Sequence, residues 1–147
     1  MQIGIRLHDT KKGTLEERVA IAEEQGFSCA HLALKKVISE YSVADSALTP
    51  GFSCYLKNLF AAHHLDIAVL GCYLNLATPD QAVLEKNVHR YMAHIRMASL
   101  LGAGVVGTET GAVNESYSFE ERNHSEEALD ILSKMSDRSC SMRKKWV

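Results

Sequence analysis

The chain has 147 residues, of which 46% are hydrophobic and 23% are charged, and its formal net charge is −2. This length and composition predict a single globular domain with its own core, and the weak charge gives no reason to bind nucleic acid or an anionic membrane. The chain contains no run of about 18 apolar residues that would cross a membrane.

The first half of the chain alternates strand patterns with helix patterns. Residues 2–9, QIGIRLHD, alternate apolar and polar positions and predict a strand. A capping box in TLEE opens a helix at Thr14, and Gly26 ends it. Residues 29–35, CAHLALK, predict a second strand, and a second helix follows with Thr49 as its N-terminal cap and proline at its first position.

The second half repeats the same alternation. Residues 67–75, IAVLGCYLN, are apolar on both faces, as in a parallel strand. The sequence TPDQ predicts a helix capped by Thr78, which stops at Gly102. Residues 104–109 predict a fourth strand, and a polar loop leads to a last helix beginning near Asn123. The predicted order is therefore strand and helix, four times.

Strict alternation of strands and helices predicts a parallel sheet with right-handed crossovers. Two α/β architectures fit this order, an open doubly wound sheet and a (β/α)8 TIM barrel. A full barrel needs about 250 residues, so four βα units would supply its N-terminal half.

Three glycines match the dinucleotide-binding pattern G-x-G-x-x-G: Gly102, Gly104 and Gly107. That motif requires a strand before it and a helix opening at its end, so that backbone N–H groups meet a pyrophosphate. Here a long helix comes first and a strand follows. We therefore interpret the glycines as a helix stop and a tight turn.

Strand parity predicts which side chains point away from the helices. In each strand the aliphatic face should meet the helices, so the polar residues near the carboxyl ends should face the other side. In a barrel that end forms the active-site mouth. The sequence thus predicts these substrate-pocket candidates, which we expect to converge at one end of the sheet: Arg6, His8, Lys35, Tyr73, Asn75 and Glu109.

Other histidines carry weaker signals. His31 lies in the middle of a predicted strand, where a buried, hydrogen-bonded role is more common than a catalytic one. His63, His64 and Asp66 resemble a metal cluster, but histidines also suit a helix carboxyl end, and we expect a solvated helix terminus. The four cysteines are scattered and the chain begins without a signal segment, so we expect a reducing, cytoplasmic environment.

Four segments resemble the xylose-isomerase-like sugar phosphate isomerase/epimerase family. They are MQIGIRL, TLEERVAIAEEQGFSCAHLAL, IAVLGCYLNLATPD and YMAHIRMASLLGAGVVGTETG, and the resemblance covers residues 1–132. It implies a TIM barrel and proton transfer next to a sugar carbonyl. It also implies a divalent metal (Mn, Mg, Co or Zn), held by carboxylates and a histidine on strands five to eight. No metal ligand or catalytic residue is carried over to this chain.

The end of the chain departs from the family pattern. Residues 133–147 lose apolar periodicity and become basic, so we expect a partial barrel domain over 1–132 and an aberrant basic tail over 133–147. A premature end, for instance after a reading-frame change, is the preferred interpretation, and a native basic tail is the alternative.

Three functions compete at this point. The first is a sugar isomerase or epimerase lineage with a small sugar or sugar phosphate as partner, neither nucleic acid nor membrane. The second is a fragment without activity, which binds metal weakly and self-associates through exposed sheet edges. The third is a DNA repair enzyme similar to endonuclease IV, which needs histidine ligands where this chain has Lys35 and Asn75.

Overall fold

The computed structural model describes residues 2–143, which fall into two compact units. The first unit holds Met1–Cys72 and Ala93–Gly107, and the second holds Tyr73–Met92 and Thr108–Val147. None of the helices in the described part of the chain combines the length and apolarity needed to cross a bilayer.

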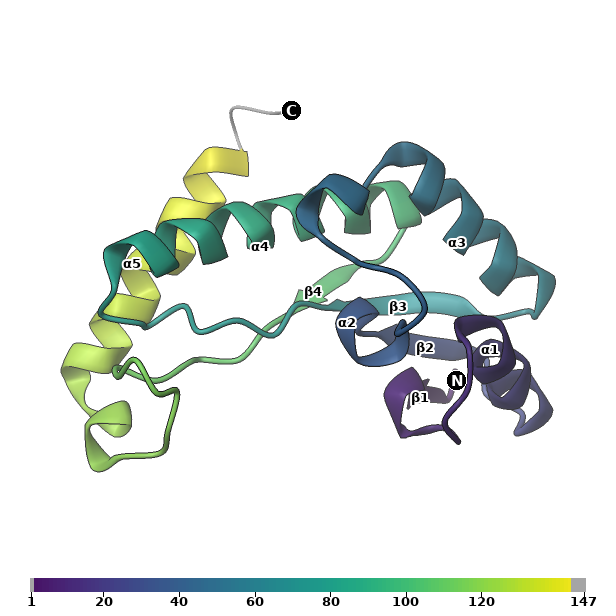
Figure 1. The fold of residues 1–147 in the computed structure, drawn as a ribbon, viewed down its shortest axis with the longest axis horizontal. Coiled ribbons are helices and arrows are strands. Elements are labelled where there is room, and N and C mark those ends of the chain that lie inside the picture. The colour runs from purple at the N-terminus through teal and green to yellow at the C-terminus, as the bar shows by residue number, and fades with distance from the viewer. Residues whose placement is uncertain (1, 144–147) are drawn as a thin grey trace. The chain divides into compact units, whose positions relative to one another are not determined.

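The first unit contains one four-stranded parallel sheet in the order β1-β2-β3-β4 (Figure 1). Helices follow the first three strands, which confirms the predicted alternation. The strands and their bounds are β1 (Gly4–Arg6), β2 (Cys29–Leu32), β3 (Asp66–Gly71) and β4 (Val105–Gly107). The helical elements of this unit are η1 (Leu7–Asp9), α1 (Leu15–Glu24), α2 (Leu34–Val37), η2 (Asp45–Ala47), α3 (Pro50–Ala62) and residues 93–101 of α4 (Gln81–Leu101).

One face of the sheet carries the hydrophobic core. Leu32 and Leu70 are fully buried there, and Ile5 and Val106 pack against the same cluster. The helices contribute Val19 and Ala22 from α1, Leu56 and Phe60 from α3, and Met97, Ala98 and Leu101 from α4. The predicted strand parity is therefore confirmed, because the aliphatic positions face the helices.

Two predicted helix caps are confirmed and one is wrong. The N–H of Glu17 donates to Thr14 Oγ1 at 3.2 Å, and the Thr14 N–H donates to the Glu17 carboxylate at 2.8 Å. Thr49 caps α3 in the same way, through the Phe52 N–H. Thr78 does not cap α4, because Asp80 accepts from the N–H groups of residues 82 and 83 at 2.8 and 3.1 Å. A carboxylate one residue before the helix start displaces the threonine, which is buried.

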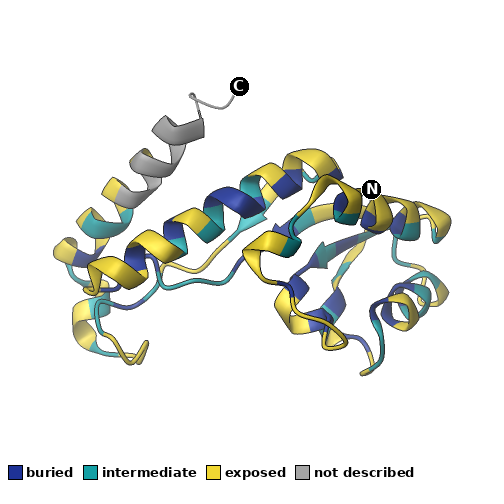
Figure 2. Cartoon of the chain, turned by 45° about the horizontal axis from the view of Figure 1, so that its top comes forward, coloured by how far each residue is buried: buried dark blue, intermediate teal, exposed yellow. Residues whose placement is uncertain are grey.

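The glycine stretch ends α4, as predicted. Gly102 has φ +79°, the left-handed conformation that glycine tolerates, and the Ala103 N–H donates to the Ala98 carbonyl at 3.0 Å. The strand β4 follows, and the next described helical element begins only at Glu121. No helix opens behind Gly107, so the context of a dinucleotide-binding loop is missing. Figure 2 shows the alternation of buried and exposed positions along α4, as expected for an amphipathic helix.

The second unit holds the loops after β3 and β4, residues 81–92 of α4, and two further helical elements. These are η3 (Glu121–His124) and α5 (Glu126–Arg143). The last helix was predicted to begin near Asn123, but Ser125 caps it by accepting from the Ala128 N–H at 3.2 Å. The helix continues into the predicted tail as far as Arg143, and residues 144–147 lie outside the described residues. The domain boundary at residue 132 stays a prediction.

Candidate functional site

The sheet face opposite the core has its own row of side chains. Parallel pairing places Arg6 beside His31, His31 beside Val69, and Val69 beside Val105. An irregularity in register after Ala30 helps set this alignment. The face is therefore polar at β1 and β2 and apolar at β3 and β4, where Val105 is 54% exposed. We call it the inner face, since it would line the interior of a barrel.

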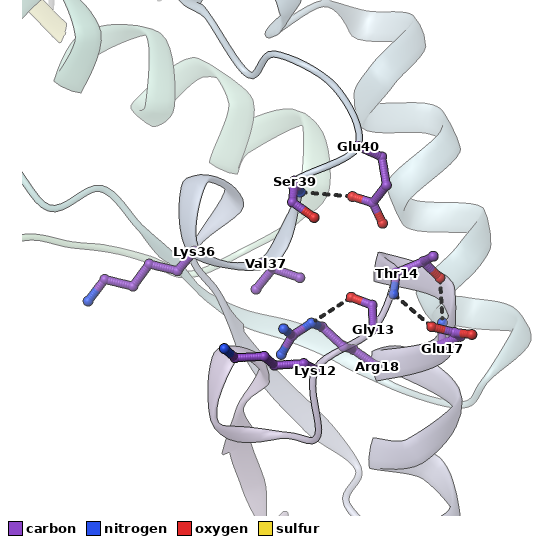
Figure 3. A pocket seen from close by; sticks show the side chains of 9 residues that line it. All are labelled: Lys12, Gly13, Thr14, Glu17, Arg18, Lys36, Val37, Ser39 and Glu40. Carbon is purple, nitrogen blue, oxygen red and sulfur yellow. Dashed lines mark hydrogen bonds between the residues drawn. The ribbon is translucent and has the colours of Figure 1, made fainter.

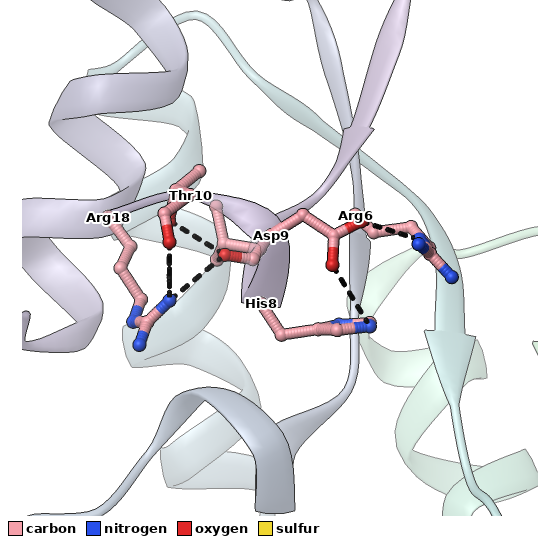
Figure 4. A network of polar contacts seen from close by, with 6 residues as sticks. Arg6, His8, Asp9, Thr10 and Arg18 are labelled. Carbon is pink, nitrogen blue, oxygen red and sulfur yellow. Dashed lines mark hydrogen bonds and ion pairs between the residues drawn. The ribbon is translucent and has the colours of Figure 1, made fainter. Parts of the chain in front are cut away.

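The chain turns directly after β1 and gathers three polar side chains. Because β1 ends at Arg6 and η1 begins at Leu7, His8 and Asp9 come close to Arg6 instead of continuing the strand. Arg6 Nε lies 2.7 Å from Asp9 Oδ2, and His8 Nε2 lies 3.9 Å from Asp9 Oδ1 (Figure 4). Two sequence-predicted site residues, Arg6 and His8, are thus brought together, and Asp9 joins them.

The His8 ring meets the His31 ring edge to face. Their centroids are 5.8 Å apart and their planes cross at 85°. Burial lowers the pKa of both imidazoles below 6.5. In His8 the Asp9 carboxylate partly offsets this lowering. In His31 the positive charges of Arg6 and Lys36 lower the pKa further. Both rings are therefore largely neutral at pH 7, and a neutral imidazole can donate from one nitrogen and accept at the other.

Gly71 on β3 makes room for this histidine pair. A Cβ at residue 71 would lie 2.4 Å from His31 Nε2, which is closer than real Cβ atoms approach, and 3.1 Å from the Ala33 Cβ, which is a tight contact. His31 is half-buried on the inner face, less buried than expected, and its structural rather than catalytic role stays a prediction. The sequence did contain a sign of this pair, because Gly71 is a glycine on β3 at a position that faces away from the helices.

Lys35 does not belong to a strand, and the prediction that placed it there is wrong. Strand β2 ends at Leu32, and Ala33 precedes the short helix α2. Leu34 and Val37 are buried three residues apart, whereas Lys35 is exposed. The stretch LALKKV fits both an alternating strand pattern and a helical pattern. The helix forms because it buries both Leu34 and Val37.

Asn75 lies in the second unit and is engaged with the main chain. Its Oδ1 accepts from the N–H groups of Ala77 and Ala112 at 3.1 and 3.0 Å, and its Nδ2 donates to the carbonyls of Ala112 and Asn114 at 2.9 and 3.4 Å. Asn75 therefore joins the loop after β3 to the loop after β4. Gly111, with φ +93°, permits the approach, because a Cβ there would lie 2.4 Å from Asn75 Oδ1.

Glu109 is exposed and accepts a short hydrogen bond from the Tyr117 hydroxyl. Burial and this bond raise the pKa of Tyr117 to about 12. Tyr73 is half-buried in the same unit. Because Tyr73, Asn75 and Glu109 belong to the second unit and Arg6 and His8 to the first, the predicted convergence of all of them stays a prediction.

No cluster of three or more His, Cys, Asp or Glu side chains able to hold a metal ion occurs among the residues that were searched, which are the described ones. His63 caps the end of α3, and its Nδ1 lies 2.6 Å from a Glu23 carboxylate oxygen. This pairing agrees with the interpretation of that stretch as a helix terminus.

Comparison of the sequence with protein-family models and with curated proteins finds no match. Solved structures do match. D-psicose 3-epimerase with D-tagatose, from Clostridium cellulolyticum H10, is 12% identical with a TM-score of 0.65, over 96% of this chain and 49% of that one. The probable 3-DHS dehydratase AsbF from Bacillus anthracis is 14% identical with a TM-score of 0.62, over 96% and 49%.

A third structure, a xylose isomerase-like TIM barrel/4-hydroxyphenylpyruvate dioxygenase fusion protein, is 16% identical with a TM-score of 0.64, over 97% of this chain and 20% of that one. At such low identities, these TM-scores show a common fold and nothing more. The chain has the fold of half of a xylose isomerase-like TIM barrel, and it spans about half the length of the epimerase and the dehydratase. The barrel, rather than the open doubly wound sheet, is the correct architecture.

Proposed function

We propose that this chain forms half of the barrel of an enzyme that isomerises or epimerises a sugar or sugar phosphate. The observation that carries the proposal is the group Arg6, His8, Asp9 and His31 on the inner face, at the carboxyl ends of β1 and β2. Active sites of TIM barrels lie at the carboxyl ends of their strands. The structural similarity to a D-psicose 3-epimerase supports this chemistry.

The inner-face side chains suit a substrate rich in hydroxyl groups. The neutral imidazoles of His8 and His31 can each donate and accept, so they can bind hydroxyls or move a proton next to a carbonyl. The Arg6 guanidinium, which is 62% exposed, is available for hydroxyl or phosphate oxygens. Tyr73, Asn75 and Glu109 belong to the second unit, where Asn75 fixes the loops after β3 and β4.

A divalent metal would polarise the sugar carbonyl in this class of reaction. The described residues do not fit such an ion, because they offer no cluster of three donors. No step of the proposed chemistry is therefore assigned to a metal, and we propose that this chain alone binds Mn²⁺ only weakly.

A second barrel half is the expected partner of this sheet. Strands β1 and β4 are its two edges, and the inner face exposes Val105 and part of Val69. Exposed edges and apolar surface favour pairing with another chain, although three-residue edge strands limit the number of backbone hydrogen bonds. We therefore propose that the isolated chain self-associates.

Sugar binding to the isolated chain tests the proposed function. We expect D-fructose and D-tagatose to shift the imidazole NMR signals of His8 and His31, while those of His63 and His64 on the first unit's α3 end stay unchanged. The His8→Ala variant should lose the shift at His31. Binding without turnover is expected, together with an oligomer in size-exclusion chromatography. Equal shifts at all four histidines, or none, would contradict a sugar site on the inner face.

A further inference from the structure

Three aromatic side chains lie together on the surface of the first unit. Tyr41 belongs to the segment between α2 and η2, and Phe52 and Tyr55 belong to α3. The Phe52 and Tyr55 rings are stacked, with centroids 6.2 Å apart, and the Tyr41 ring meets Phe52 edge to face at 6.1 Å. Phe52 also packs against the core on the helix side of the sheet. Tyr41 is 46% exposed and Tyr55 is 39% exposed, so the rings hold one another in place and remain open to solvent.

Two carboxylates border these rings. The Tyr55 hydroxyl donates to Glu16 in the first turn of α1, and this bond lowers the pKa of the Glu16 carboxyl, so Glu16 is ionised at pH 7. Glu40 is exposed beside Tyr41 in the chain and accepts from the Ser39 N–H at 2.8 Å. Burial raises the pKa of Tyr41, and the charges of Glu16 and Glu40 raise it further. Both carboxylates therefore lie near the same ring.

The negative charge beside the rings has no ion-pair partner. In the part of the chain that the structure describes, neither Glu16 nor Glu40 forms an ion pair. Figure 3 shows that the ammonium groups of Lys12 and Lys36 point away from the Glu40 carboxylate. Aromatic faces and carboxylates both attract cations, so this surface complements a positively charged group. We call it the aromatic–acidic surface, and its members are Glu16, Glu40, Tyr41, Phe52 and Tyr55.

We propose that the aromatic–acidic surface binds an arginine side chain presented by a partner protein. A guanidinium is planar and weakly hydrated, so it can stack on a tyrosine ring while its N–H groups pair with a carboxylate. A lysine ammonium is more strongly hydrated and lacks the planar fork, which favours arginine. The exposed rings suit a side chain that projects from another protein, whereas sites for small molecules enclose their ligand. The inference does not depend on the proposed sugar chemistry.

An NMR titration of the full chain with two matched peptides tests the proposal. The probe is acetyl-Gly-Arg-Gly-amide, and the control is the same peptide with citrulline, which has the shape of arginine without its charge. We expect saturable shifts of the Tyr41 and Tyr55 ring signals with the arginine peptide. The citrulline peptide should bind about fivefold more weakly, because the cation–π and ionic attractions are lost.

Two results of this titration would overturn the proposal. The first is equal affinity for the two peptides, or no saturable shift with either of them. The second is a shift of the same rings with methyl β-D-glucoside and none with the arginine peptide, which would assign the rings to a sugar. Added sodium chloride should weaken binding of the arginine peptide, since salt screens exposed charges.

Single substitutions locate the binding. Glu40→Gln removes the charge and keeps an oxygen for the Ser39 N–H, so it should weaken binding of the arginine peptide about fivefold. Tyr41→Leu removes an exposed ring and should weaken binding to a similar extent. The matched control is Glu24→Gln at the exposed end of α1, which should change the affinity by less than about twofold. Equal losses of affinity in Glu40→Gln and Glu24→Gln would overturn the proposal.

Discussion

The polar residues after β1 and those after β3 follow the same sequence pattern, but the structure uses them differently. After β3, both polar atoms of the Asn75 side chain bond to main-chain groups of two loops. At the end of β1 and directly after it, Arg6 and His8 contact another side chain, and Arg6 remains 62% exposed. Strand parity places a side chain on a face, whereas its hydrogen-bond partners decide whether it holds the fold or is available to a ligand.

Substitution of Asn75 should have the largest effect on stability. Asn75→Ala leaves the buried N–H groups of Ala77 and Ala112 without their acceptor, which should lower the free energy of unfolding by about 3 kcal/mol. Urea denaturation measures the change. The control is Asn58→Ala on an exposed position of α3, which should cost less than about 0.5 kcal/mol. Equal losses of unfolding free energy in Asn75→Ala and Asn58→Ala would refute the role of Asn75 in holding the two loops together.

Gly71 tests the packing of the inner-face histidine pair. Gly71→Ala brings a methyl group to 2.4 Å from His31 Nε2, so the ring must move, and we expect a loss of about 2 kcal/mol. Gly104→Ala is the matched control, since a Cβ there meets nothing within 4 Å, and it should stay within about 0.5 kcal/mol of the parent.

A double-mutant cycle separates the contact from a general backbone effect. In a His31→Ala background the methyl group at residue 71 has lost its closest neighbour, so the cost of Gly71→Ala should fall by about half. An unchanged cost in that background would show that the backbone, and not the His31 ring, resists the substitution.

Much of the fold follows from local patterns in the sequence. The strands, the caps at Thr14 and Thr49 and the stop at Gly102 each follow from residues within one or two turns of chain. Such signals need no knowledge of distant neighbours. The boundaries shifted where two patterns compete, as at Lys35 and Asp80.

The candidate site was less predictable, because its contacts join residues far apart in the chain. Parity placed Arg6 on the inner face, but His8 lies beyond the end of β1, and its pairing with His31 depends on the turn into η1 and on Gly71. The burial of Arg18 depends on the carbonyls of Leu7 and Gly13, which no pattern in α1 reveals. The bonds between Asn75 and the loop after β4 span 37 residues.

The histidine pair should make stability depend on pH. The pKa values of His8 and His31 are lowered below 6.5 in the folded state, so the unfolded chain binds more protons as the pH falls through that range. The contribution of the neutral rings to stability is complete above pH 6.5 and is lost as the pH decreases through the folded-state pKa values.

Thermal or urea unfolding between pH 7 and pH 5 measures this dependence. The double variant His8→Gln and His31→Gln should flatten the curve, whereas His89→Gln, at an exposed position of α4, should leave its slope unchanged. If stability still falls with pH to the same extent in the double variant, other groups cause the pH dependence, and the two histidines do not contribute to it.

Arg6 should show the smallest effect on stability and a clear effect on binding. Its pair with Asp9 is exposed on both sides, and such pairs contribute about 0.5 kcal/mol or less, so Arg6→Met should barely change the urea midpoint. If Arg6 is available to a ligand, the same variant should weaken binding of D-fructose about tenfold, since a guanidinium hydrogen bond is lost. Asp9→Asn is the matched control, because it removes the same ion pair and keeps the guanidinium, so sugar binding should persist. If Arg6→Met instead lowered the free energy of unfolding by about 2 kcal/mol, Arg6 would stabilise the fold as Asn75 does. The residues at the ends of β1 and β3 would then have the same structural role.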